Sequence, residues 1–254
     1  MEWLYLIIFF ILGLVLGSFF NVVGYRLPRG ERFSKGRSIC PNCKHKLSWY
    51  ELIPLFSFLF QKGKCRHCNS KIALFYPIIE LSCGLLFMIC YYSFGFSYEL
   101  LLSLSIVSLF LIVLVSDLLY LIIPDEIIIF FGIIFLILQT LILGFPNILF
   151  QLGSSLILFL FMFFLMKLGL FLFKKESLGG GDVKLMALVG LVLHPILGIL
   201  VVFLASLIAL PISLVLLYTK KEKVIPFGPF LVLSFLLLFL MKIDINSILM
   251  WFGF

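Results

Sequence analysis

Long runs of apolar residues recur along nearly the whole chain, and short polar segments separate them. Each run is close to the length of about 20 residues that an α-helix needs to cross a bilayer. The short alternating segments of a transmembrane β-barrel are absent from the sequence. The pattern predicts an all-α polytopic membrane protein with about eight transmembrane helices, at residues 3–24, 73–94, 98–116, 127–144, 148–173, 185–198, 199–219 and 228–243.

Two of these runs need a closer reading. The stretch from 186 to 218 is too long for one membrane helix and short for two full ones. Because proline disfavours helix interiors, Pro195 offers a break, and we expect two short helices with a turn near His194. The first run begins at Trp3 with no basic residue before it and no obvious cleavage site after it. We therefore expect a permanent helix and not a removed signal peptide.

The composition agrees with a membrane protein. Hydrophobic residues make up 63% of the chain and charged residues only 12%, about half the charged fraction of a soluble domain. The formal net charge is +7, and eleven of the 19 Lys and Arg residues lie in the polar segment 25–72. Basic loops stay on the cytoplasmic side, so we expect this segment, and by alternation 117–126, 174–184 and 220–224, to face the cytoplasm. The basic cluster thus indicates topology and contact with lipid headgroups, not nucleic-acid binding.

The polar segment contains two C-x-x-C pairs, Cys40 with Cys43 and Cys65 with Cys68. Two such pairs can direct four thiolates at one point, and this tetrahedral set favours Zn²⁺. The alternative is two disulfides, which the expected cytosolic location disfavours. A site of four cysteines is closed to other ligands, so its metal would be structural and would fold a segment with little core of its own.

The domain organisation follows from these features. We expect a first transmembrane helix at 1–24, a cytoplasmic cysteine-rich zinc insert at 25–72 between helices 1 and 2, and a helical bundle at 73–254. His45 and His67 stand beside the cysteines, and we expect them at the surface of the insert; the alternative is that one of them replaces a cysteine as a metal ligand.

Three aspartates, Asp117, Asp125 and Asp182, lie near predicted helix ends. Acids at membrane depth are costly and are therefore functional candidates. Helix capping is the simpler explanation for Asp125 and could hold for Asp182, but an anion at a helix C-terminus opposes the dipole at Asp117. The glycine run at 179–181 would let the backbone approach closely or adopt conformations closed to other residues. On residue types alone, aspartyl proteolysis, ion-coupled transport and structural acids all stay open.

Short motifs follow one another along nearly the whole chain. They are GSFFNVV at 17–23, RLP at 26–28, SICPNC at 38–43, IP at 53–54, GKCRHC at 63–68, YPIIE at 76–80, Asp117 with IPD at 123–125, GGGDVK at 179–184 and PFGP at 226–229. A G-x-G-D string alone is weak evidence. Together, and in this order, the motifs resemble the bacterial type IV prepilin peptidase family, also called prepilin leader peptidase/N-methyltransferase.

The resemblance implies a membrane aspartyl protease of the G-x-G-D type, with Asp117 and Asp182 as its catalytic residues. The implied supporting positions are Gly179, Gly181, Asp125 and Lys184. The implied substrates are prepilins and pseudopilins, whose short basic leader is cut at the cytoplasmic face of the bacterial inner membrane.

The resemblance also implies a second activity. Many family members methylate the new N-terminal residue with S-adenosylmethionine, and the four-cysteine insert is typical of these bifunctional members. No glycine-rich nucleotide loop is visible in the sequence, so we assign no residue to this cofactor. Two alternatives stay open: a peptidase without methyl transfer, and a zinc-stabilised membrane transporter or assembly factor.

Overall fold

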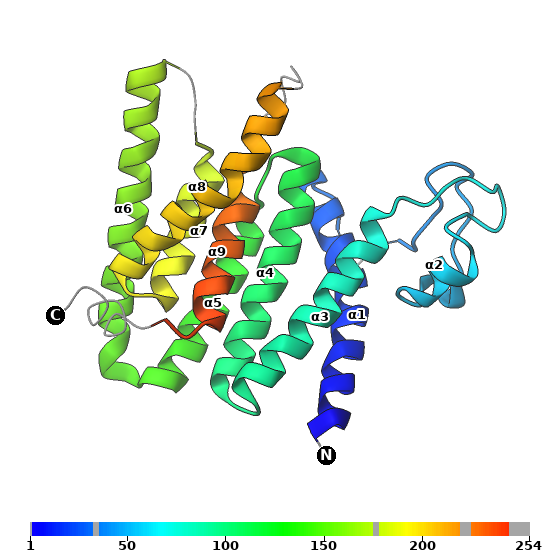
Figure 1. The fold of residues 1–254 in the computed structure, drawn as a ribbon, viewed down its shortest axis with the longest axis horizontal. Coiled ribbons are helices and arrows are strands. Elements are labelled where there is room, and N and C mark those ends of the chain that lie inside the picture. Colours follow the sequence, from blue (N-terminus) through cyan, green and yellow to red (C-terminus); the bar gives the residue numbers. More distant parts are fainter. Residues whose placement is uncertain (1, 33–35, 175–177, 219–224, 244–254) are drawn as a thin grey trace. The chain divides into compact units, whose positions relative to one another are not determined.

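The computed structural model describes residues 2–32, 36–174, 178–218 and 225–243 and divides into two compact units, Met1–Phe96 and Ser97–Phe254 (Figure 1). The described residues are mostly helical. They contain no β-strand, only two isolated β-bridges in the polar insert. The all-α fold expected from the sequence is therefore confirmed.

Eight apolar helices in the described part of the chain account for the apolar runs. Six of them, α1, α3, α4, α5, α6 and α8, are long and apolar enough to cross a membrane, whereas α7 and α9 have 13 residues each. The protein is thus a multi-pass membrane protein with two additional short helices. The bounds are α1 Glu2–Arg26, α3 Phe75–Phe94, α4 Tyr98–Tyr120, α5 Asp125–Leu143, α6 Ile148–Phe173, α7 Gly180–Val192, α8 Pro195–Tyr218 and α9 Gly228–Leu240, with shorter helices η1 Leu27–Arg29, η2 Trp49–Leu52, α2 Phe56–Phe60 and η3 Phe145–Asn147.

The break expected near His194 is present, but the boundary predicted between residues 198 and 199 is wrong. α7 ends at Val192 and α8 begins at Pro195, so α8 is 24 residues long and not a short helix. At the first position of a helix, proline loses no hydrogen bond and its fixed φ suits the helix. Pro195 therefore starts α8 instead of interrupting it.

In the first unit, α1 packs against α3 through two glycines that lie one turn apart. A Cβ on Gly13 would lie 2.7 Å from the carbonyl oxygen of Cys83, and one on Gly17 would lie 2.8 Å from the Cys83 Cβ. Small residues at this spacing let two membrane helices approach closely. The insert is tied to the same helix, because the Leu55 N–H donates to the buried Glu80 carboxylate of α3 at 2.9 Å.

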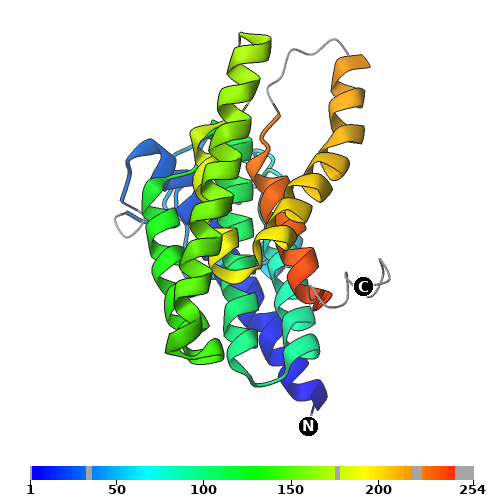
Figure 2. The ribbon, with the colours of Figure 1, turned by 90° about the vertical axis from the view of Figure 1, so that its left-hand side faces the viewer.

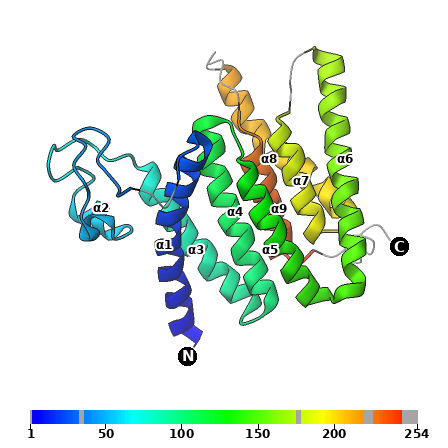
Figure 3. The same ribbon diagram turned by 180° about the vertical axis from the view of Figure 1, so that it is seen from behind.

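In the second unit, α4 packs against α5 and α9, while α7 packs against α5, α6 and α9 (Figure 3). α8 contacts α9 and α6 as well, but α6 and α8 stand apart towards the top of Figure 2. Since neighbouring helices surround α7, a helix too short to span the membrane on its own is buried along much of its length.

The C-terminal end of α7 lies inside this bundle, where its free carbonyl groups need partners. Gln139 Nε2 of α5 donates to the Val192 carbonyl at 3.3 Å, and Ser154 Oγ of α6 donates to the Leu193 carbonyl at 2.7 Å. These bonds anchor one end of α7 to two neighbouring helices. The other end carries Asp182.

Candidate functional site

Asp117 and Asp182 meet at Gly228, the first residue of α9. The point where a Cβ on Gly228 would stand lies 2.9 Å from Asp117 Oδ2 and 3.3 Å from Asp182 Oδ1. Carboxylate oxygens from two segments far apart in the sequence therefore face the same small space. The proximity of these aspartates, which the sequence left open, comes from the packing of α4, α7 and α9.

Asp117 lies in the last turn of α4 and is only 6% exposed. The carbonyl groups at this end of α4 disfavour an anion. The start of α9 offsets this, because the backbone N–H of Gly228 donates to the Asp117 carboxylate. The N-terminus of α9 thus stabilises the Asp117 carboxylate, which the C-terminus of α4 would destabilise.

Asp182 is the third residue of α7 and is also 6% exposed. Its Oδ2 accepts a hydrogen bond from the Gly179 N–H at 3.3 Å, which is a helix-capping contact. Its Oδ1 faces Gly228 and Asp117 instead. The capping explanation is therefore right for one oxygen of Asp182, and the other oxygen belongs to the aspartate pair.

The glycine run before Asp182 does only part of what we expected. None of the three glycines at 179–181 has a positive φ, so the run needs no left-handed conformation. Gly181 alone is tightly packed, since a Cβ there would lie 3.0 Å from the Ile123 Cβ. A Cβ on Gly228 would likewise lie 2.9 Å from the Cδ1 atom of Ile123. Gly181 thus leaves room for Ile123 beside the aspartates.

Asp125, the first residue of α5, and Lys184, the fifth residue of α7, form an ion pair that joins these two helices. Their side chains are 63% and 45% exposed, respectively, so water screens the attraction between them. Asp125 is two residues after Ile123, which packs beside the aspartates, and Lys184 is two residues after Asp182.

A pair of carboxylates this close can do acid–base chemistry. Two like charges at short distance repel, so such a pair can hold one proton between its two members. The ionised carboxylate can take a proton from water while the protonated one donates to a carbonyl oxygen. The arrangement therefore suits the hydrolysis of a peptide bond brought to Gly228.

Gly228 was not among the predicted site residues, although it approaches both aspartates. A signal for it existed in the PFGP motif at 226–229, where the glycine stands between two prolines. Its role depends on the close approach of α9 to two other helices, which no local pattern reveals.

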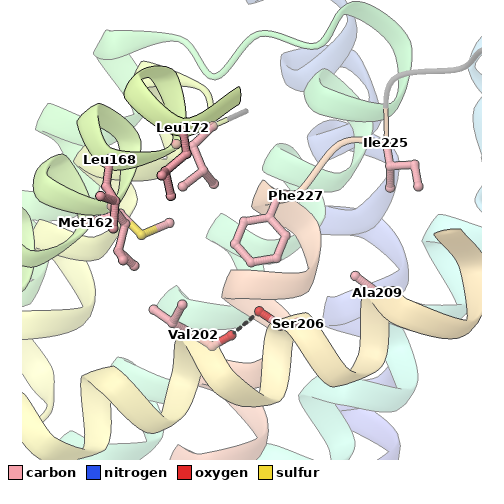
Figure 4. A pocket seen from close by; sticks show the side chains of 11 residues that line it. Met162, Leu168, Leu172, Val202, Ser206, Ala209, Ile225 and Phe227 are labelled. Atoms are coloured by element: carbon pink, nitrogen blue, oxygen red, sulfur yellow. Dashed lines mark hydrogen bonds between the residues drawn. The ribbon is translucent and has the colours of Figure 1, made fainter. Parts of the chain in front are cut away.

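A groove with a volume of about 520 Å³ lies between α6 and α8, beside the start of α9 (Figure 4). Its lining is almost wholly apolar, and the described residues that line it include no charged side chain. Phe227, which directly precedes Gly228, forms part of the wall (Figure 4). The lining of the groove thus includes the residue next to Gly228, but neither of the aspartates. Its other lining residues are Met162, Leu165, Leu168, Gly169, Leu172, Leu178, Val202, Ser206, Ala209 and Ile225.

In the first unit, the sulfur atoms of Cys40, Cys43, Cys65 and Cys68 lie within 4.8 Å of one another. Cys40 Sγ and Cys68 Sγ are 3.8 Å apart, and all six cysteines of the chain are free thiols. A zinc ion bound by four sulfurs at about 2.3 Å holds them about 3.8 Å apart. The spacing fits a zinc tetrahedron and does not fit two disulfides.

The two halves of this site repeat one another. Each C-x-x-C pair with the turn that follows it forms one knuckle. In the first knuckle the Cys40 N–H donates to the His45 carbonyl, and in the second the Cys65 N–H donates to the Ser70 carbonyl, both at 2.9 Å. The residue after the second cysteine of each pair, Lys44 or Asn69, has a positive φ. Two copies of one local turn thus present the four sulfurs.

The surroundings of two of the four thiols, Cys40 and Cys68, favour the thiolate form, which is the form that binds metal. Backbone N–H groups of Cys43 and Asn42 lower the pKa of the Cys40 thiol to about 6. Ser70, whose Oγ lies 3.0 Å from Cys68 Sγ, lowers the pKa of the Cys68 thiol. These donors prepare the Cys40 and Cys68 sulfurs for a cation.

Two family models match the chain. The model for the bacterial peptidase A24 N-terminal domain matches residues 11–94, and the model for the type IV leader peptidase family matches residues 104–214. The first match contains the four cysteines, and the second contains both aspartates. No solved structure matches the chain.

Several curated proteins called prepilin leader peptidase/N-methyltransferase are similar to the chain. The one from Bacillus subtilis is 40% identical over 186 residues, which cover 73% of each chain. The one from Myxococcus xanthus is 38% identical over 199 residues, 78% of this chain and 59% of the relative. The one from Stutzerimonas stutzeri is 30% identical over 254 residues, 88% of this chain and 86% of the relative.

Proposed function

Because the chain belongs to the type IV leader peptidase family, we propose that it is a membrane aspartyl endopeptidase that removes the leader peptide of type IV prepilins and pseudopilins. The observation that carries this proposal is the approach of Asp117 and Asp182 to the same point at Gly228. The exposed position of Asp125, in an ion pair with Lys184, supports a positioning role for that third acid.

In the proposed reaction, Asp117 and Asp182 share one proton. The ionised carboxylate takes a proton from a water molecule, whose oxygen attacks the scissile carbonyl carbon. The protonated carboxylate donates to the carbonyl oxygen, and the C–N bond then breaks as the amide nitrogen takes up a proton. Burial of both aspartates supports this chemistry, because little bulk water competes there.

The groove between α6 and α8 suits the apolar part of such a substrate. A prepilin carries an apolar helix directly after its cleavage site, so that helix must stay out of water while the peptide bond reaches the aspartates. The apolar lining and the position of Phe227 next to Gly228 support this placement. The substrate can then remain in the membrane throughout the reaction.

We place the reaction at the cytoplasmic face of the bacterial inner membrane. The basic segment 25–72 supports a cytoplasmic insert, and α3 and α4 then return the chain to the same side near Asp117. The leader of the substrate is short and basic and would also lie in the cytoplasm.

The proposal is tested by substituting each aspartate in membranes that contain a prepilin. Asp117→Asn and Asp182→Asn keep the size of the side chain but remove its acid–base function. Each is expected to reduce the rate of leader cleavage by about a hundredfold or more, measured as the shift from prepilin to mature pilin on a gel.

Glu99→Gln is the matched control, because Glu99 is an exposed acid at the other end of α4. It is expected to cleave at the normal rate. Normal cleavage by either aspartate variant would refute the pair and favour the alternative of a zinc-stabilised transporter or assembly factor.

We further propose that the enzyme adds one methyl group to the new N-terminal amine, with S-adenosylmethionine as the methyl donor. The names of the relatives support this second activity, and the four-cysteine insert, held by structural Zn²⁺, lies in the part that matches the N-terminal family domain. Mass spectrometry of the mature pilin N-terminus tests it. Mature pilin without the added methyl mass would leave a peptidase that does not methylate.

A further inference from the structure

A second group of metal-ligand side chains, His45, Glu51 and His67, lies beside the four cysteines. One nitrogen from each imidazole and one carboxylate oxygen lie within 4.8 Å of one another, and the centroids of the two imidazole rings are 3.4 Å apart with the ring planes tilted by 32°. The first knuckle, the helix η2 and the second knuckle each contribute one of these residues. His67 is exposed, as the sequence predicted, but His45 is half-buried.

The burial and hydrogen bonding of Glu51 indicate that this group is not a chance cluster of surface side chains. Glu51 is only 6% exposed, although it lies in a small, polar insert. Its Oε2 accepts a hydrogen bond from the Ser48 N–H at 2.8 Å, whereas its Oε1 is buried and has no hydrogen-bond partner. A buried carboxylate oxygen without a partner destabilises the fold unless a cation or a donor satisfies it. A cation between Glu51 and the two imidazoles would satisfy it.

We propose that His45, Glu51 and His67 bind a second Zn²⁺ ion, separate from the one held by the four cysteines. Two imidazole nitrogens and one carboxylate are a recognised zinc ligand set that leaves a fourth position open. Zinc bound at about 2.0–2.2 Å from each atom would bring the three ligand atoms to about 3–4 Å from one another, which small side-chain rotations achieve.

The charges nearby agree with a cation at this position. Four thiolates around one Zn²⁺ leave an excess of negative charge directly beside His45 and His67, and Glu51 adds another negative charge. Together they offset part of the positive charge of the insert, in which eleven Lys and Arg residues stand against two glutamates. The second ion would tie η2 to both knuckles, and through the nearby Leu55 it would steady the contact with α3.

The test counts metal in the full chain, purified in detergent, stripped of metal under reducing conditions and dialysed against Zn²⁺ alone. The wild-type chain is expected to bind two equivalents. Glu51→Gln keeps an acceptor for the Ser48 N–H but removes the charge, so its second equivalent should bind about tenfold more weakly or not at all. His67→Gln is expected to give the same loss.

Glu31→Gln is the matched control, because Glu31 is an exposed acid of the same insert that pairs with Arg29. It is expected to keep two equivalents. Titration with Co²⁺ separates the sites, since only the first equivalent should give thiolate-to-cobalt charge-transfer absorption. The same absorption in Glu51→Gln would show that the cysteine site still folds.

Three results would overturn the proposal: one equivalent in the wild type, a second equivalent that Glu51→Gln and His67→Gln leave unchanged, or a second equivalent that adds thiolate absorption. The metal count does not depend on prepilin cleavage. A metal count that contradicts the second site would therefore not bear on the proposed protease activity. Likewise, normal cleavage by the aspartate variants would not bear on the proposed metal site.

Discussion

The four cysteines lie on two loops that repeat one local turn, whereas the two aspartates lie on α4 and α7 and approach each other only where α9 begins. In the cysteine site, each C-x-x-C pair sets the distance between its own two sulfurs. In the aspartate site, no local segment sets the distance between the two carboxylates. The first site should therefore tolerate changes in the bundle, while the second should respond to small changes in helix packing.

The largest expected effect is that of Gly228→Ala, which adds one methyl group 2.9 Å from Asp117 Oδ2 and 3.3 Å from Asp182 Oδ1. Such contacts are too short, so the carboxylates or α9 must shift, and a shift of about 1 Å can cost a hundredfold in rate. Prepilin cleavage should fall by about that factor, while the zinc content of the insert stays the same.

Gly153→Ala is the control for this change, since no atom lies within 4 Å of a Cβ at this position in α6. It should cleave normally. If Gly228→Ala also cleaves normally, the aspartate site does not depend on close helix packing, and the contrast with the cysteine site is wrong.

Cys43→Ser should reduce the zinc content more than the cleavage rate, because it removes one sulfur ligand of the closed site. The tightly bound zinc should be lost, and proteases should cut within residues 25–72 faster than in the wild type. Metal analysis and limited proteolysis measure the two effects. Cleavage of prepilin should fall less than in Gly228→Ala.

Cys83→Ala provides the control, since it removes a buried thiol of α3 that lies outside the metal site. It should keep its zinc. A loss of cleavage by Cys43→Ser that exceeds the loss in Gly228→Ala would mean that the two regions do not work independently.

Ala209→Phe should have an intermediate effect, because it fills the groove between α6 and α8 without touching the aspartates. Overpacking of this size costs about 1–3 kcal/mol, so we expect KM for a prepilin to rise about tenfold with little change in kcat. The same substitution at Leu207, an exposed residue of α8 that does not line the groove, should change neither constant. A fall in kcat alone would place the substrate helix elsewhere.

Lys184→Met should have the smallest effect, since its ion pair with Asp125 is exposed. Exposed pairs contribute at most about 1 kcal/mol, which corresponds to a change in cleavage rate of about fivefold or less. Asp125→Asn should match it, and the double variant should be no worse than either single one. A hundredfold loss in Asp125→Asn would instead move Asp125 into the reacting group.

The apolar runs predicted the helices well, because the bilayer requires nearly continuous apolar stretches of fixed length. The turn near His194 was predicted correctly, but the next helix was expected to start at residue 199 and starts at Pro195, because proline can either interrupt a helix or begin one. The part played by the glycines before Asp182 could not be predicted for a similar reason. Gly181 is needed because Ile123 packs against it, not because of its own backbone angles.

By itself, the sequence determined the membrane class, the order of the helices and the four-cysteine cluster, since each depends on composition or on spacing along a short segment. Only the tertiary structure decided that Asp117 and Asp182 face the same point, that Gly228 lies between them, and that Glu51 is buried beside His45 and His67. These features depend on the packing of segments distant in the chain. A short pattern can state which groups are present, but the distances between such groups are set by side chains elsewhere in the fold.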